Sequence, residues 1–370
     1  MKHFRAGLSG RQSLTSACLT LLIVLSGVGL HAQNTNPLDT VPGVNPMPGL
    51  KTEGTIPHWT VSGTSILDAN GAPIRLRGFN VNWWVPPTEQ DARDIRQLGA
   101  NGVRYMFGYD AKGTYDPSQI EEVERQIHAF TSQGLWVIPV LYIFEVPDPA
   151  NPKKKLGPWS TPALNQEFLA LWSDLITRLG SDPLVVAWEP LNEPHDTDPA
   201  IVAAWYRDLL PRLRKLDPQR PIVVEGANYS HAADLTAPFK MDDPNIIYAF
   251  HFYDPFKYTT DLQNPLLVYP GTWGKDYLAK TIEPAIRFRD QFHVPVWCGE
   301  WGTKTAAPGY DRWLHDVFDL LEANHFDWCI WSWALQPKDP QNTSFDINKQ
   351  KTEVYGVTKD LFDSLHLLQP

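Results

Sequence analysis

The chain of 370 residues has little cysteine, no surplus of positive charge and few long apolar runs, and each shortage excludes a class of protein. Three cysteines are too few for a disulfide scaffold or a cysteine-rich metal site. The 32 basic residues are outnumbered by 42 acidic ones, which argues against a nucleic-acid-binding surface. Beyond residue 30, no segment is long and apolar enough to cross a bilayer.

Tryptophan, by contrast, is abundant. The chain has 15 tryptophans in a composition that is otherwise ordinary for a globular protein, with 43% hydrophobic and 20% charged residues. Aromatic side chains offer flat apolar faces to a core and to ligands. We therefore expect a large core and a surface that meets flat, amphipathic ligands.

The first 32 residues have the layout of a secretory signal peptide. Basic residues precede an apolar stretch at 17–30, and Leu30-His31-Ala32 gives a small-residue cleavage pattern. The stretch is short for a membrane span, which makes an uncleaved anchor the weaker alternative. We expect an exported protein, secreted or periplasmic, without membrane contact after cleavage.

The rest of the chain divides into a leader and one folded domain. Residues 33–57 are rich in Asn, Pro, Gly and Thr and lack apolar periodicity, which is typical of a flexible segment. Apolar patterning begins at Trp59. We therefore expect a signal peptide at 1–32, a leader at 33–57 and a catalytic domain at 58–370.

Runs of strand length alternate with helical patterns through this domain. The apolar runs lie at 74–81, 102–107, 136–144, 185–191, 221–225, 246–253, 295–301 and 327–333. Helical periodicity fits 89–98, 120–130, 168–179, 200–216, 276–292, 310–324 and 359–367. Apolar strands separated by helices indicate a parallel sheet covered by helices.

Eight such units predict one (β/α)₈ TIM barrel of the α/β class. A short N-terminal β-hairpin precedes it, because runs at 60–67 and 73–77 flank the turn pair Asn70-Gly71. A doubly wound open sheet is the alternative, but no Gly-x-Gly-x-x-Gly follows an early strand. Long segments at 145–161, 254–275 and 336–356 follow strands and are predicted to form the walls of a cleft.

Two glutamates are predicted to meet at the carboxyl ends of the strands. Glu193 follows the fourth run, in Trp188-Glu189-Pro190-Leu191-Asn192-Glu193-Pro194-His195, and Glu300 ends the seventh, in Cys298-Gly299-Glu300-Trp301. Active sites of such barrels lie at this end. Hydrolysis of a glycosidic bond needs one carboxylic acid to protonate the leaving oxygen and one carboxylate to attack the sugar or activate water.

These motifs resemble those of glycoside hydrolase family 5, the cellulase family in the clan of retaining (β/α)₈ glycosidases. The resemblance rests on the Asn192-Glu193-Pro194 signature and extends from about residue 66 to 333. Arg77-Gly78-Phe79-Asn80 resembles the opening strand, and Trp328-Cys329-Ile330-Trp331 the eighth. The resemblance implies that Glu193 is the acid/base and Glu300 the nucleophile.

The resemblance also implies roles for residues around this pair. Arg104, in Gly102-Val103-Arg104, would hold the nucleophile ionised. His251 and Tyr253, in the His-x-Tyr of the sixth strand, would assist the acid/base and hydrogen-bond the nucleophile, and Trp331 would floor the subsite at the scissile bond. From its position, Asn192 is expected to bind the sugar 2-hydroxyl.

One departure concerns the third strand, where the family usually has a histidine that reaches the sugar. This chain has Tyr142 there, which predicts a changed subsite. Tryptophans at strand ends are predicted to stack on sugar rings, namely Trp83, Trp84, Trp301, Trp331 and Trp333. By alternation, Trp297 and Trp328 are expected under the helices.

Alternation also places three further side chains inside the barrel. Cys298 and Cys329 each lie two residues before an inward position and are expected to be free thiols, with a disulfide as the alternative. Glu189 is expected to be a buried structural partner of an arginine such as Arg77. An arginine at a strand end, such as Arg104, could equally pair with a structural carboxylate.

Together these features predict a monomeric retaining β-glycosidase without metal or cofactor, acting on a β-linked polysaccharide or oligosaccharide. No metal motif is visible, because position 253 is Tyr where a His-x-His pair would need histidine. The first expectation is an endo-β-1,4-glucanase. A β-mannanase, an exo-acting β-glucosidase, a non-catalytic carbohydrate-binding barrel and a metal-dependent barrel hydrolase are the alternatives.

Overall fold

A computed structural model of the chain describes residues 59–260, 267–304, 307–333 and 353–365. All of them lie within one unit of the chain, Pro48–Pro370. The predicted signal peptide, the leader and most of the last long segment lie outside the described residues. None of the helices in the described ranges is both long and apolar enough to span a bilayer.

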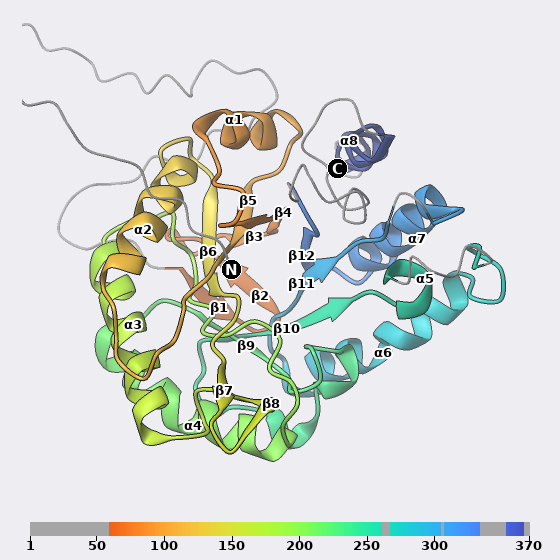
Figure 1. Cartoon of the computed structure of the whole chain (residues 1–370). Coiled ribbons are helices and arrows are strands. Elements are labelled where there is room, and N and C mark those ends of the chain that lie inside the picture. Colours follow the sequence, from red (N-terminus) through yellow and green to blue (C-terminus); the bar gives the residue numbers. More distant parts are fainter. Residues whose placement is uncertain (1–58, 261–266, 305–306, 334–352, 366–370) are drawn as a thin grey trace, which may run out of the picture. The chain divides into compact units, whose positions relative to one another are not determined.

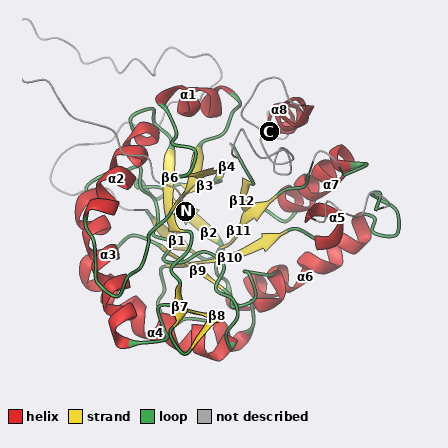
Figure 2. Cartoon of the chain, viewed as in Figure 1, coloured by secondary structure: helices red, strands yellow, loops and turns green. Residues whose placement is uncertain are grey.

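A curled parallel sheet forms the centre of this unit (Figures 1 and 2). Its seven strands follow the order β6-β5-β4-β12-β11-β10-β9, and every neighbouring pair is parallel. The strands are β4 (Arg77–Asn82), β5 (Gly102–Phe107), β6 (Trp136–Leu141), β9 (Ile222–Glu225), β10 (Ile246–Phe252), β11 (Val296–Trp301) and β12 (Asp327–Ile330).

The predicted fourth strand closes this sheet into a barrel by isolated bridges. Val185 pairs with Val137 and Glu189 with Val140 of β6, while Trp188 pairs with Ile222 of β9. The chain advances four residues here while β6 advances three, so the fourth run carries one extra residue. This irregularity explains why the run is no continuous strand. The (β/α)₈ barrel is confirmed.

Helices cover the outside of the barrel, as Figure 2 shows in red. They are α1 (Glu89–Gln97), α2 (Ser118–Thr131), α3 (Pro162–Leu179), α4 (Pro199–Leu216), α6 (Lys275–Phe292), α7 (Tyr310–Ala323) and α8 (Glu353–Leu365). Their starts follow local chemistry: Thr161 and Asp198 cap α3 and α4, each followed by proline. The predicted apolar stripe of α3, including Phe168 and Trp172, is fully buried against the sheet.

A small antiparallel sheet closes the amino-terminal end of the barrel. The predicted run 60–67 is in fact two strands, β1 (Thr60–Ser62) and β2 (Ser65–Leu67), because the chain turns at Gly63 with φ +57°. The predicted hairpin joins β2 to β3 (Pro73–Ile74). Trp59 contacts Trp136 at the start of β6 and donates its indole N–H to the carbonyl of Pro183, 2.8 Å away.

Two segments expected as long loops contain structure of their own. Residues 145–161 hold the β-hairpin β7 (Val146–Asp148) and β8 (Asn151–Leu156), and residues 254–275 hold the short helix α5 (Phe256–Thr260). Two turns of 3₁₀ helix follow β9, at Ala232–Asp234 and Ala237–Phe239. The last helix begins at Glu353, six residues before its predicted start at Lys359.

Candidate active site

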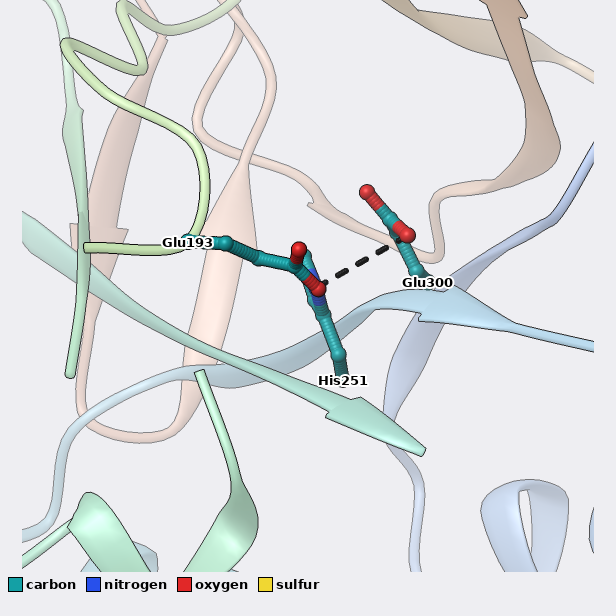
Figure 3. Close-up of side chains that lie close together, drawn as sticks. All are labelled: Glu193, His251 and Glu300. Atoms are coloured by element: carbon teal, nitrogen blue, oxygen red, sulfur yellow. Dashed lines mark hydrogen bonds and ion pairs between the residues drawn. The ribbon is translucent and has the colours of Figure 1, made fainter. Parts of the chain in front are cut away.

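Glu193 and Glu300 lie side by side at the carboxyl ends of the barrel strands, with His251 between them (Figure 3). One oxygen of each glutamate and one ring nitrogen of His251 all lie within 4.8 Å of one another. Glu193 follows the fourth run, His251 belongs to β10 and Glu300 to β11. Residues from three positions of the barrel, the fourth run, β10 and β11, are therefore brought to one point.

Glu300 is held by donors on both of its oxygens. The guanidinium of Arg104 donates to Oε1 at 2.7 Å, and the hydroxyl of Tyr253 donates to Oε2, also at 2.7 Å. Nδ1 of His251 lies 3.8 Å from Oε2. The Glu300 side chain is 5% exposed. A permanent cation and a phenol hydroxyl at these distances are the partners that suit a carboxylate.

Glu193 lies in a different environment. Its Oε1 is 2.8 Å from Nδ1 of His251, and its side chain keeps a quarter of its surface exposed. Burial, and then the negative charge of Glu300, raise the pKa of Glu193 despite its contact with His251. The two facing carboxyls therefore differ: Glu193 favours its proton, while Glu300 accepts hydrogen bonds from two donors.

Arg104, on β5, binds Glu300 of this pair and two further carboxyl groups beneath it. Its Nε and Nη2 donate to both oxygens of Glu189 at 2.9 and 2.8 Å, Nη2 also donates to Glu225 at 2.8 Å, and Nη1 donates to Glu300. Nη2 further donates to Oδ1 of Asn192 at 2.8 Å. The arginine is fully buried. Arg104 thus pairs both with Glu300 and with structural carboxylates.

The predicted partner of Glu189 was wrong. Glu189 pairs with Arg104 at the carboxyl ends of the strands, whereas Arg77, at the start of β4, pairs with Glu322 at 2.8 Å. The reason is position along the strand, since Arg77 and Glu189 belong to opposite ends of the barrel. That Glu189 is buried and bound to an arginine is as expected.

The two buried carboxyls below the site, Glu189 and Glu225, differ in protonation state. Burial raises the pKa of Glu189 well above its usual range even though Arg104 is beside it. Burial would do the same to Glu225, but the charge of His251, a hydrogen bond from Glu189 and the charge of Arg104 together hold its pKa far below that range. Glu189 is therefore the carboxyl that keeps a proton and Glu225 the one that loses it.

His251 carries positive charge in this setting. Burial alone would lower its pKa, but the negative charges of Glu300 and Glu225 raise it well above its usual range. Its Nε2 lies 3.4 Å from Oε1 of Glu225, so a carboxyl oxygen faces each ring nitrogen. Nδ1 is hydrogen-bonded to Glu193 and Nε2 lies at ion-pair distance from Glu225, a setting that suits the imidazolium form.

A cluster of four aromatic side chains lines the site beside Glu300. Tyr142 contacts Trp83 and Trp84 with ring centroids 5.4 and 5.3 Å apart, and Trp84 lies 6.4 Å from Trp331. All four rings are partly exposed. Burial, and then the charges of Glu300 and Glu193, raise the pKa of Tyr142 to about 12.

Two tryptophans predicted to face sugar are instead in the core. Trp333 is 1% exposed, packs on Phe79 and donates its indole N–H to Asp91 of α1 at 3.0 Å. Trp301 is fully buried against Trp313 and Trp328, between the sheet and the helices. Neither ring leaves a face for a ligand, and these two predictions were wrong.

Trp301 follows Glu300, whose side chain points into the site, so ordinary alternation turns Trp301 toward the helices. A β-bulge in β11 changes the alternation of the residues before Glu300. Phe250 pairs with Cys298 and His251 with Glu300, so Gly299 is an extra residue opposite β10. The bulge reverses the alternation: Trp297 belongs to the inner cluster, and Cys298 to the outer one. The expected outward Trp297 and inward Cys298 were therefore wrong, whereas Trp328 packs under the helices as expected. Cys298 and Cys329 are free thiols, as predicted.

Sequence reasoning missed three contributors to the site. Glu225 ends β9 and accepts the main-chain N–H of Glu193 at 2.6 Å. The strand-end rule that selected Glu193 would also have found it, because the fifth predicted run ends at Glu225. His195 stacks on Tyr229 with ring centroids 4.4 Å apart, beside Glu193, and no sequence pattern announces that contact.

Among the described residues, one group of three side chains could hold a metal ion: Glu193, His251 and Glu300. A metal needs a free lone pair on the histidine. Here both ring nitrogens face carboxyl oxygens and the ring favours its second proton. The chemistry of this group fits proton transfer better than coordination.

Comparison with known proteins defines the class. The family model of cellulase, glycosyl hydrolase family 5, matches residues 67–336. Endoglucanase C of Acetivibrio thermocellus is 25% identical over 288 residues, covering 66% of this chain and 83% of that protein. Cellulase CelDZ1 of Thermoanaerobacterium sp. is 26% identical over 286 residues, covering 72% and 67%.

Solved structures share the fold. An endocellulase of Pyrococcus horikoshii, in complex with cellotetraose, has a TM-score of 0.62 at 20% identity, covering 83% of this chain and 98% of that one. A Thermotoga maritima cellulase in complex with mannotriose has a TM-score of 0.62 at 17% identity, covering 77% and 96%. The chain is therefore a glycoside hydrolase with a (β/α)₈ barrel, a β-glycosidase. It belongs to glycosyl hydrolase family 5, the cellulase family.

Proposed function

We propose that this protein hydrolyses internal bonds of a β-1,4-glucan by double displacement, with Glu193 as acid/base and Glu300 as nucleophile. The observation that carries the proposal is the pair of facing carboxyls, with oxygens within 4.8 Å of each other. Of the two, Glu300 is the one bound by both Arg104 and Tyr253, and burial with the charge of Glu300 raises the pKa of Glu193. The two carboxyls thus match the two different roles that the reaction requires.

The separation favours retention of configuration. Retaining glycosidases hold their carboxyls about 5–5.5 Å apart, whereas inverting ones leave roughly 6.5–9.5 Å for a water molecule. The distance between Glu193 and Glu300 leaves no room for a water between carboxylate and sugar. In the first step a carboxylate oxygen of Glu300 bonds to the anomeric carbon, the bond from that carbon to the leaving oxygen breaks, and Glu193 gives its proton to that oxygen.

The second step follows from the electrostatics of the pair. The charge of Glu300 helps to raise the pKa of Glu193, and that charge disappears when Glu300 becomes an ester. The pKa of Glu193 then falls, so the deprotonated carboxylate can take a proton from water. Water attacks the anomeric carbon, the ester bond breaks and Glu300 returns as a carboxylate.

Partly exposed aromatic rings support a sugar polymer as the substrate. Trp84, Trp331 and Tyr142 offer apolar faces beside Glu300, and Tyr229, half-exposed on His195, offers another beside Glu193. Pyranose rings stack on such faces. With aromatic surface on both sides of the carboxyl pair, a chain can be bound on both sides of the bond that is cut, which favours internal cleavage.

Specific observations support two other substrate specificities. The Thermotoga maritima cellulase was solved with mannotriose, and Tyr142 replaces the usual histidine near the scissile bond, so a β-mannanase is the second candidate. Cellodextrinase A of Ruminococcus flavefaciens, 24% identical over 286 residues, favours activity on short oligosaccharides as the third.

Export completes the proposal. We propose that residues 1–32 are removed as a signal peptide, that 33–57 form a leader, and that 58–370 act as a monomeric catalytic domain outside the cytoplasm. The charged start, the apolar stretch at 17–30 and the pattern ending at Ala32 support this.

Product analysis tests the function. Wild type and Glu300→Ala are incubated with carboxymethylcellulose, glucomannan, mannan, xyloglucan and laminarin. We expect mixed oligosaccharides from carboxymethylcellulose with wild type and none with the variant. Products from mannan alone would establish the β-mannanase, and monosaccharide alone an exo-enzyme. Equal product from Glu300→Ala would refute the assignment of the nucleophile.

A further inference from the structure

Glu225 is a buried carboxyl to which the reaction above gives no part. It ends β9, is fully buried and cannot touch a sugar. Its Oε2 accepts the main-chain N–H of Glu193 at 2.6 Å. Its Oε1 accepts from Nη2 of Arg104 at 2.8 Å and lies 3.4 Å from Nε2 of His251. One side chain thus contacts the main chain of one proposed catalytic residue and two cations around the pair.

We infer that Glu225 is the positioning residue of the acid/base, an inference that rests on the proposed function. Its carboxylate fixes Glu193 by two routes that meet at the same side chain. The first route runs through the main-chain N–H of Glu193. The second runs through His251, whose Nε2 faces Glu225 and whose Nδ1 lies 2.8 Å from Oε1 of Glu193.

The main-chain route is under strain. Glu193 has φ +45°, in the left-handed region that residues with a side chain seldom adopt. Such a conformation costs about 1–3 kcal/mol and persists only where the surroundings fix it. Here Glu225 accepts the N–H of Glu193, while Nδ1 of His195 lies 2.6 Å from its carbonyl oxygen. Without the acceptor, the backbone can relax and carry the carboxyl away from Glu300.

The histidine route depends on charge. Nδ1 of His251 is hydrogen-bonded to Glu193, and Nε2 lies 3.4 Å from Oε1 of Glu225, an ion-pair distance. The ring attracts the Glu225 carboxylate in this way only when it carries two protons. The other groups that face Glu225 are Arg104 from β5, Glu189 from the fourth run and Tyr206 from α4, whose hydroxyl accepts the main-chain N–H of Glu225 at 3.2 Å. Removal of the Glu225 charge should lower the pKa of His251, so that the ring loses its second proton more readily.

Two substrates that differ in their need for an acid distinguish a loss of acid positioning from a general loss of folded or active enzyme. The bond in cellotetraose breaks only with a proton from Glu193, whereas 2,4-dinitrophenolate leaves 2,4-dinitrophenyl β-cellobioside without one. For Glu225→Gln we expect kcat/KM to fall roughly 100-fold on cellotetraose and less than about threefold on the dinitrophenyl glycoside. The ratio of the two values does not depend on the fraction of folded enzyme, so partial unfolding cannot imitate the result.

The chain offers a matched control. Glu167, on α3, is another buried glutamate that accepts main-chain N–H groups, from Lys112 at 3.0 Å and Gly113 at 2.7 Å. We expect Glu167→Gln to keep the wild-type ratio of the two substrates. As a second readout, ¹⁵N resonances of the His251 ring should titrate at lower pH in Glu225→Gln than in wild type.

The outcomes are distinct. An equal loss on both substrates, or a ratio like that of Glu167→Gln, would overturn the inference while leaving the proposed function intact. An unchanged titration of His251 would overturn the histidine route. A wild-type enzyme that hydrolyses neither glycoside would refute the proposed function, and this inference with it.

Discussion

Single residues in this barrel differ by the charge around them more than by their own chemistry. Glu193, Glu225 and Glu300 are the same side chain at the ends of three strands or runs. Burial and the charge of Glu300 raise the pKa of Glu193, whereas His251 and Arg104 hold the pKa of Glu225 down. The roles we propose follow from these differences.

The raised pKa of Glu193 predicts the alkaline side of the pH profile. The protonated form is the acid, so kcat/KM on cellotetraose should fall as pH rises through that pKa, which lies above the ordinary value of about 4.3 for glutamate. Glu193→Gln should lose roughly 10²- to 10⁴-fold on cellotetraose. Its residual activity on a dinitrophenyl glycoside should lack this alkaline fall. Persistence of the same fall in the variant would assign it to another group.

Two neighbouring tryptophans make a matched pair. Trp331 is partly exposed beside Trp84, whereas Trp333 is buried on Phe79. We expect Trp331→Ala to raise KM for cello-oligosaccharides with little change in the free energy of unfolding. Trp333→Ala should instead lower that free energy by about 3–5 kcal/mol and leave the KM of the folded enzyme unchanged. Urea unfolding and steady-state kinetics on both variants check this, and a reversed pattern would contradict the placement of the rings.

Arg104 should matter for stability as well as for the site. Arg104→Met leaves Glu189, Glu225 and Glu300 without their shared cation. Breaking a buried ion pair costs about 3–5 kcal/mol, which urea unfolding would detect. As control, Arg93→Met removes an exposed partner of Glu89 on α1 and should change little. Similar losses in both variants would count against the buried cluster.

At the scale of elements, hydrophobic patterning predicted the strands and helices well, because the strands are buried on both faces and each helix on one. The stripe of α3 with Phe168 and Trp172 is an example. Periodicity could not predict the bulge at Gly299 or the extra residue in the fourth run, since both depend on pairing between strands. The errors at Trp297 and Cys298 follow from the first of these.

The same limit applies to the site. Strand ends located Glu193 and Glu300, and family resemblance suggested partners such as Arg104 and Tyr253. The contact of Glu189 with an arginine was assigned to Arg77 in place of Arg104, because the height of each side chain along the barrel is not visible in sequence. The stacking of His195 on Tyr229 joins two loops and was equally invisible.

The bulge in β11 makes a prediction of its own. A Cβ at Gly299 would lie 3.1 Å from Nε2 of His251 and 3.2 Å from Nε1 of Trp297. Gly299→Ala should therefore displace His251. Because His251 positions the acid/base, we expect kcat to fall about tenfold, less than the loss caused by removal of the acid/base itself. Gly356→Ala, on α8 with open space around it, is the matched control and should keep full kcat. Full kcat in Gly299→Ala would show that this contact does not position His251.

At the scale of the whole molecule, the reaction is expected to need no metal. Glu193, His251 and Glu300 are close enough to bind one, but the contacts of His251 favour the imidazolium. Prolonged dialysis against a chelator should leave kcat/KM on carboxymethylcellulose unchanged. A loss restored by a divalent cation would contradict the proton-transfer account.

Double displacement requires a covalent bond between the sugar and Glu300. A 2-deoxy-2-fluoro cellobioside with a dinitrophenolate leaving group slows the second step, so the intermediate can be digested and sequenced by mass spectrometry. The account predicts one added sugar per protein, on the peptide that contains Glu300 and absent from Glu300→Ala. A label on another residue, or turnover without any label and with inverted product, would contradict it.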